Sequence, residues 1–141
     1  MASNLVPTKV VPINSNATVA TSQTTTGTSY TDLATGGPSV TVDTGTRAMV
    51  IVTATIANNT ASAYSYMDYA VSGATTRSAS DSTAATVRQT GATSGQNQEI
   101  RLSSASIVTL TAGRNTFTSK YRVSGGTGTF INREIIVINL Q

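Results

Sequence analysis

Residues 44–77 read TGTRAMVIVTATIANNTASAYSYMDYAVSGATTR and contain two long strand-like patterns, one directly after the other. The first pattern, Ala48 to Ile56, is apolar at nearly every position, which is typical of a strand that is buried on both faces. Asn58 and Asn59 then turn the chain. The second pattern runs from Tyr64 to Val71 and ends at a Ser-Gly pair, so this stretch predicts two neighbouring β-strands.

Similar patterns lie on both sides of this stretch, and turn residues separate them roughly every 8–12 positions. The further expected strands are Ser29–Leu33, Ser39–Val42, Ala85–Gln89, Glu99–Leu110, Thr116–Val123 (with Phe117, Ser119, Tyr121 and Val123 on one face) and Thr129–Leu140. Apart from its short strand, residues 74–98 are expected to form an exposed loop. A helix over residues 78–88 is the alternative there, but Ser and Thr are weak helix formers. The sequence therefore predicts an all-β fold, an antiparallel β-sandwich or jelly roll.

Composition fits one folded domain. The chain has 141 residues, of which 38% are hydrophobic and only 11% are charged, with a formal net charge of +3. A chain of this length buries enough surface for a core of its own. Disorder would require a high net charge together with the low hydrophobicity, and the net charge is small.

The first 22 residues differ from the rest. Pro7 and Pro12 interrupt any regular pairing, and the apolar residues come in short groups: Leu5, Val6, Val10, Val11 and Ile13. We expect an extended N-terminal arm over residues 1–22, which pairs with a sheet edge of its own subunit or of a neighbour, and a sandwich over residues 23–141. A frayed terminus is the alternative. The arm lacks the pattern of a signal peptide, and no run is long enough to span a bilayer, so we expect synthesis in the cytoplasm.

Reactive side chains are scarce. The chain has no histidine and no cysteine, which removes the commonest metal ligands and the neutral-pH base. Asp68 is the carboxylate of most interest, and we expect it to pair with an arginine. The Gly-rich residues 125–128 lead into a strand, which favours a hairpin turn over a phosphate-binding loop. We therefore predict no catalytic residues, no cofactor, no metal and no small-molecule substrate: the protein is not expected to be an enzyme.

Arginine and tyrosine are the residues that point to protein contacts. The seven arginines are spread singly, which favours a solvated face or subunit contacts over nucleic-acid binding. Strand alternation places Tyr64 and Tyr66 on the face opposite Tyr69, so one set packs the sandwich and the other is available to a partner. Core packing of all three, with hydroxyls reaching solvent, is the alternative. The candidate interface residues are Leu5, Val6, Val10, Val11, Ile13, Tyr64, Tyr66 and Arg122.

Three blocks of the sequence, YTDLATGGPSVTV (30–42), YAVSGATTR (69–77) and NTFTSKYRVSGGTGTF (115–130), carry a family resemblance. Residues 24–140 resemble a β-sandwich module of tailed phages that infect actinobacteria, found in small head decoration proteins and at the ends of minor tail proteins. The resemblance implies a capsid decoration (cement) protein on the capsid surface of the virion. It implies trimers with tumour-necrosis-factor-like packing, the major capsid protein as partner, and no catalytic motif. From the spread of the arginines and the absence of a long apolar run, we expect neither nucleic acid nor a membrane as a partner. The alternative is a tail or fibre module that binds a receptor or carbohydrate through residues 74–98.

Overall fold

Nine strands and one turn of 3-10 helix make up the described part of the chain, residues 14–91 and 98–140 of this computed structural model. In chain order they are β1 (Asn14–Val19), β2 (Gln23–Thr25), β3 (Ser39–Thr44), β4 (Arg47–Asn58), β5 (Tyr64–Gly73), η1 (Asp81–Thr83), β6 (Ala85–Arg88), β7 (Ile100–Thr109), β8 (Gly113–Val123) and β9 (Gly128–Asn139).

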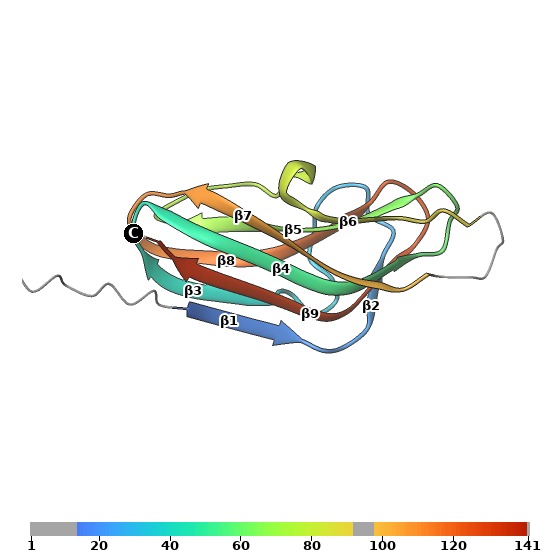
Figure 1. Ribbon diagram of the computed structural model, residues 1–141, viewed down its shortest axis with the longest axis horizontal. Coiled ribbons are helices and arrows are strands. Elements are labelled where there is room, and N and C mark those ends of the chain that lie inside the picture. The colour runs from blue at the N-terminus through green and yellow to red at the C-terminus, as the bar shows by residue number, and fades with distance from the viewer. Residues whose placement is uncertain (1–13, 92–97, 141) are drawn as a thin grey trace, which may run out of the picture.

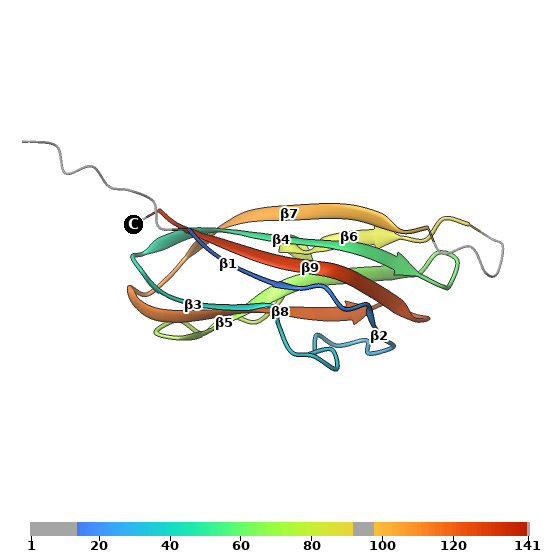
Figure 2. The same cartoon turned by 90° about the horizontal axis from the view of Figure 1, so that it is seen from below.

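The strands form two antiparallel sheets that pack face to face (Figure 1). One sheet has the order β1-β9-β4-β7, and β2 pairs with the end of β9 beyond β1. The other sheet has the order β3-β8-β5-β6. Figure 2 shows β7, β4 and β9 in one layer and β3, β5 and β8 in the other. The predicted all-β antiparallel sandwich is confirmed.

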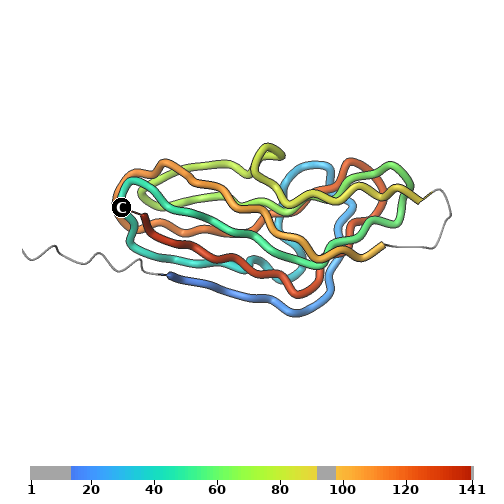
Figure 3. The backbone as a smooth tube through the Cα atoms, in the orientation of Figure 1, coloured from blue at the N-terminus to red at the C-terminus, as the bar shows by residue number. Residues whose placement is uncertain are grey.

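The pairing of the strands is nested, which makes the sandwich a jelly roll. β1 pairs with β9, β3 with β8, β4 with β7, and β5 with β6. The chain thus forms one long antiparallel hairpin that is rolled up, and the contacts of β4 with β9 and of β5 with β8 close the roll. Figure 3 shows β1 and β9 side by side although they lie near opposite ends of the sequence.

The core lies between the inner faces of the two sheets. Its largest apolar members are aromatic: Tyr121 and Phe130 pack edge to face with centroids 4.9 Å apart, and Tyr69 packs against Phe117 at 6.2 Å. The prediction that alternate residues of 117–123 share one face is confirmed, because all four are buried. β4 and β9 add five large aliphatic side chains to the core: Val50, Val52, Ile56, Ile135 and Val137.

Most element boundaries follow the sequence patterns, but β2 was not predicted as a strand. The expected strand at 29–33 is wrong, because only Thr31 forms an isolated bridge, to Tyr121. The helix considered for residues 78–88 is reduced to η1, and β6 confirms the short strand expected there. Within the predicted arm, residues 14–19 form β1 and pair with β9 of the same chain, while residues 1–13 lie outside the described residues.

Arg133 departs from the expectation that the arginines are solvated or at subunit contacts, because it is fully buried. It lies two residues before Ile135 and shares its inward face. The guanidinium donates to the carbonyl oxygen of Gly37 at 3.1 Å and to Oε1 of Gln23 at 2.8 Å, and it stands 5.3 Å from the ring centroid of Tyr121. These contacts compensate the lost hydration and fasten β2 and the loop before β3 to the sandwich.

Candidate functional site

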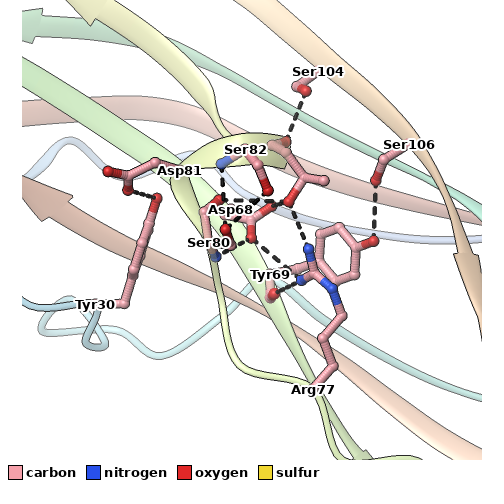
Figure 4. A network of polar contacts seen from close by, with 10 residues as sticks. Tyr30, Asp68, Tyr69, Arg77, Ser80, Asp81, Ser82, Ser104 and Ser106 are labelled. Carbon is pink, nitrogen blue, oxygen red and sulfur yellow. Dashed lines mark hydrogen bonds and ion pairs between the residues drawn. The ribbon is translucent and has the colours of Figure 1, made fainter.

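The most polar cluster of the interior surrounds Asp68 on β5 (Figure 4). Its fully buried carboxylate accepts hydrogen bonds from the backbone N–H of Ser80 at 2.7 Å and from Oγ1 of Thr83 at 2.9 Å. It also forms an ion pair with Arg77 at 3.3 Å. The expected pairing of Asp68 with an arginine is therefore confirmed. Alternation places Asp68 on the outer side of β5, and η1 with its flanking residues buries it by folding over that side.

Every part of this cluster is engaged with another part of the chain. Arg77 donates to the carbonyl oxygen of Tyr69 at 2.5 Å and to Oγ1 of Thr83 at 2.6 Å, and it lies 4.1 Å from the ring centroid of Tyr69. The hydroxyl of Tyr69 shares a 3.0 Å hydrogen bond with Ser106 on β7. Burial raises the pKa of Tyr69, so its hydroxyl stays neutral. The cluster fastens the segment 77–83 to both sheets, and it offers neither a free base nor an activated nucleophile.

The second cluster lies on the outer face of the β3-β8-β5-β6 sheet, and we call it the tyrosine–arginine cluster: Tyr30, Tyr64, Tyr66, Arg88, Arg122 and Asp81. The rings of Tyr64 and Tyr66 stack with centroids 5.9 Å apart and an interplanar angle of 24°. The register of the sheet places Arg122 opposite Tyr66, with its guanidinium 4.1 Å from that ring centroid. Arg88 stands opposite Tyr64 in the same way, at 5.6 Å.

Asp81 holds this cluster in place from η1. It forms an ion pair with Arg122, whose Nε donates to the carboxylate at 2.8 Å. The hydroxyl of Tyr30 donates to the same carboxylate at 2.8 Å. Hydrogen bonding to Arg122 is the main cause that lowers the pKa of Asp81, and the same contact raises the pKa of Arg122. Burial raises the pKa of Tyr30, and its hydrogen bond to Asp81 adds to this effect, so the cluster holds fixed charges at neutral pH.

The remainder of that outer face is polar. Hydroxyl pairs join β3 to β8 at Ser39 with Thr118 and at Thr41 with Thr116, at 2.9 and 2.8 Å. An exposed ion pair links Asp43 of β3 to β8 at 3.8 Å. Side chains of this kind keep a sheet face in contact with water. Apart from the tyrosine–arginine cluster, this face has the composition of a solvated surface.

The outer face of the other sheet is apolar over half its length. Two neighbouring cross-strand rows over β9, β4 and β7, together with Leu140 directly after β9, bring together the residues that we call the apolar strip: Met49, Ile51, Ile107, Ile136, Ile138 and Leu140. The row of Leu140 also contains Arg47 and Thr109, which are polar and exposed. Met49 has Ile138 on one side and Ile107 on the other. Ile107 is 54% exposed and Leu140 is 38% exposed, while the other members are half-buried. The strip therefore presents apolar side chains to solvent at one end of this sheet face.

The apolar strip corrects the expectation for Ala48–Ile56. That pattern predicts a strand buried on both faces, but in β4 only the inner face is fully buried, and Met49 and Ile51 on the outer face remain partly exposed. The strip residues were not predicted as interface residues. The unbroken apolar run of β4 was the sequence signal that could have identified them, because a strand with one solvated face alternates with polar residues.

The predicted interface residues divide into two sets. Tyr64, Tyr66 and Arg122 come together in the tyrosine–arginine cluster, with both tyrosines half-buried on the face opposite Tyr69. The other five lie in residues 1–13, outside the described residues: Leu5, Val6, Val10, Val11 and Ile13. In residues 14–91 and 98–140, no group of three or more acidic side chains gathers as a metal site would require. No helix in the same ranges has the length and hydrophobicity of a membrane span.

Comparison with solved structures finds chains with a similar fold. The chain is similar to VP2 of infectious bursal disease virus in its subviral particle, with a TM-score of 0.53 and 12% identity. It is also similar to the T=1 particles derived from that virus, with a TM-score of 0.53 and 14% identity. Both matches cover 99% of this chain but only 37% and 36% of the other, so the chain spans little more than a third of their length. No family model and no curated protein sequence matches the chain.

Proposed function

We propose that this chain is a structural virion protein, a capsid decoration (cement) protein that binds the outside of a phage head as an oligomer and stabilises the shell. The observation that carries the proposal is the apolar strip, because a sandwich whose second outer face is apolar at one end is suited to lie against other subunits there. Its jelly roll is also the fold of VP2, which forms subviral particles. The sequence blocks that resemble decoration proteins agree with this function.

The proposed mechanism is mechanical. Each oligomer, a homotrimer by analogy with the family it resembles, contacts the major capsid protein of adjacent capsomers on the virion surface. Contacts that are weak one by one become strong together, because binding at one site raises the effective concentration at the next. The tyrosine–arginine cluster, with Tyr64, Tyr66 and Arg122, supplies a second contact surface on the opposite face of the sandwich.

An enzymatic role is not part of the proposal. Asp68, the carboxylate best placed to do chemistry, is held by Arg77, Ser80 and Thr83. A catalytic acid or base must reach the proton that it transfers, and this carboxylate is fully buried. These contacts give Asp68 a structural role.

Binding to capsids tests the proposal directly. Purified protein is mixed with expanded capsids that lack it, the capsids are sedimented, and the pellet is imaged by cryo-electron microscopy. We expect stoichiometric co-sedimentation, extra density on the outer surface, and capsids that withstand a higher temperature before they break. Protein that stays in the supernatant at every concentration would refute the decoration function. In the control, the same capsids are mixed with bovine serum albumin in place of the protein.

Receptor or carbohydrate binding is the second candidate function, and the stacked rings of Tyr64 and Tyr66 favour it. Sugar rings bind to aromatic faces, and the two flanking guanidiniums could donate hydrogen bonds to hydroxyls or acidic groups. Binding to a glycan array that is lost in Tyr66→Ala, together with no binding to capsids, would establish this function over the first. The loop expected to carry the site, residues 74–98, is described only to residue 91 and at residue 98.

A further inference from the structure

We propose that the apolar strip of one copy is the docking site for residues 1–13 of a neighbouring copy. This inference deepens the proposed function and rests on it, since it takes the chain to be part of an assembly. The strip occupies one end of the β1-β9-β4-β7 sheet, from the row of Leu140 to the row of Ile136 and Ile51. Beyond that, Glu134 and Thr53 pair and the face becomes polar. The surface to be covered is therefore compact and has one open end.

The N-terminal segment joins the fold at that same end. Asn14, the first residue of β1, lies opposite Ile138, a member of the strip. From there β1 runs toward Arg133, away from the strip, so the chain enters β1 at the end of the sheet where Leu140 lies. In an assembly in which these ends of the subunits meet, the segment of one copy is delivered to the strip of the next.

The chemistry of residues 1–13 complements the strip. The segment MASNLVPTKVVPI has five branched aliphatic side chains and a single charged one, Lys9. Burial of such side chains against the strip removes apolar surface from water on both partners. Glu134, at the polar border of the strip, accepts a hydrogen bond from Asn16 but has no ion pair within the described residues, so it is available to Lys9.

The prolines favour a neighbouring copy over the same copy. The sequence favours extended conformations at Val6 and Val11, because each precedes a proline. For residues 1–13 to reach the apolar strip of their own copy, the chain would have to reverse tightly between Pro12 and Asn14. That turn would contain the β-branched Ile13, and β-branched residues are disfavoured in tight turns. An extended segment of 13 residues reaches about 40 Å, which is enough to cross onto an adjacent domain.

Crosslinking of mixed chains tests the docking, because the protein has no cysteine of its own. One chain carries Leu5→Cys and a second, distinguishable by a size tag, carries Ile107→Cys, and the two are mixed and treated with a short bis-maleimide. We expect a covalent heterodimer as the main product. Ile100→Cys replaces Ile107→Cys in the control, since Ile100 is comparably exposed at 45% but lies at the far end of β7. With Ile100→Cys the yield of heterodimer should fall at least about tenfold, because Leu5→Cys in the docked segment is not close to position 100.

Removal of residues 1–13 provides the second measurement. By light scattering, the full chain should be oligomeric and the shortened domain monomeric, with unchanged far-ultraviolet circular dichroism. Ile107→Lys should weaken the oligomer as the deletion does, since a lysine loses hydration when it is buried against aliphatic side chains, and Ile100→Lys should not. Absence of the covalent heterodimer, equal crosslinking at positions 100 and 107, or an oligomer that survives the deletion would each overturn the inference.

The two proposals fail separately. Oligomers that depend on residues 1–13 but do not bind capsids would refute the decoration function and leave the docking in place. Monomers that bind capsids would refute the docking and the oligomeric form of the decoration protein, but they would leave binding to the capsid in place.

Discussion

Replacement of Asp68 by alanine tests whether the buried cluster organises the surface above it. The carboxylate is fully buried, receives three donors and compensates the charge of Arg77. Removal of this carboxylate leaves the N–H of Ser80 without its acceptor. It also leaves the largely buried guanidinium of Arg77 without a negative charge beside it, although its hydrogen bonds to Tyr69 and Thr83 remain. Breaking a buried ion pair from one side costs about 3–5 kcal/mol, so we expect Asp68→Ala to lower the free energy of unfolding by about 4 kcal/mol.

The expected loss converts to a temperature shift. An unfolding entropy of about 2.1 cal/mol/K per residue gives roughly 0.3 kcal/mol/K for the 141 residues, so the Tm should fall by about 13 °C. The matched control is Asp43→Ala. The side chain of Asp43 is 78% exposed and forms an ion pair with Arg114. Exposed pairs contribute little, and the control should change stability by less than about 1 kcal/mol.

Urea unfolding followed by far-ultraviolet circular dichroism measures both variants, since the chain has no tryptophan. The double variant Asp68→Ala with Arg77→Ala completes a cycle. Its loss should be smaller than the sum of the two single losses by about 1–3 kcal/mol, because the second change removes the uncompensated charge. The reasoning fails if Asp68→Ala costs no more than Asp43→Ala, or if the two losses simply add.

Three further predictions concern single positions. Gly73→Ala should destabilise the protein by about 1–3 kcal/mol, because φ is +102° there and a Cβ would collide with a backbone carbonyl of β8, whereas Gly36→Ala, with open space around it, should be neutral in the same urea titration. Burial raises the pKa of Tyr121 to about 12, so its contribution to stability should be complete below pH 10, the ordinary pKa, and decline between pH 10 and 12; Tyr121→Phe should flatten that decline, as measured by urea midpoints. The lowered pKa of Asp81 means that pairing with Arg122 stabilises the fold above the ordinary pKa of 3.8 and is lost as the pH falls further; Asp81→Asn should reduce the acid sensitivity of the melting temperature, and an unchanged profile would contradict this.

Local patterns were sufficient to predict most strands, because alternation and turn residues act within a few positions. The face of β8 that carries Phe117 and Tyr121 and the separation of Tyr66 from Tyr69 follow from alternation alone. The burial of Arg133 was also readable, since it shares the parity of Ile135 and Val137, but the general preference of arginine for the surface weighed against it.

Long-range contacts set the limits of prediction. Alternation places Asp68 beside Tyr66 on an outer face, yet η1 covers Asp68 and leaves Tyr66 half-exposed, and no local pattern shows where a Ser- and Thr-rich segment will fold. The contact of Arg122 with Tyr66 depends on the register between β5 and β8, which distant turns determine. The outer face of β4 shows the reverse case: its apolar pattern predicts more burial than one chain provides.

The position of β9 at the centre of its sheet constrains how the polypeptide acquires its structure. β9 bridges β1, β2 and β4, yet the ribosome makes it after the other eight strands of the described residues. The nascent chain therefore cannot complete this sheet until β9 is made, and β1 has no pairing partner before then. Such distant partners slow folding to the range of milliseconds to seconds. During that interval the apolar side chains of β4 are exposed on both sides, which makes nascent copies prone to aggregate and would favour chaperone capture before assembly.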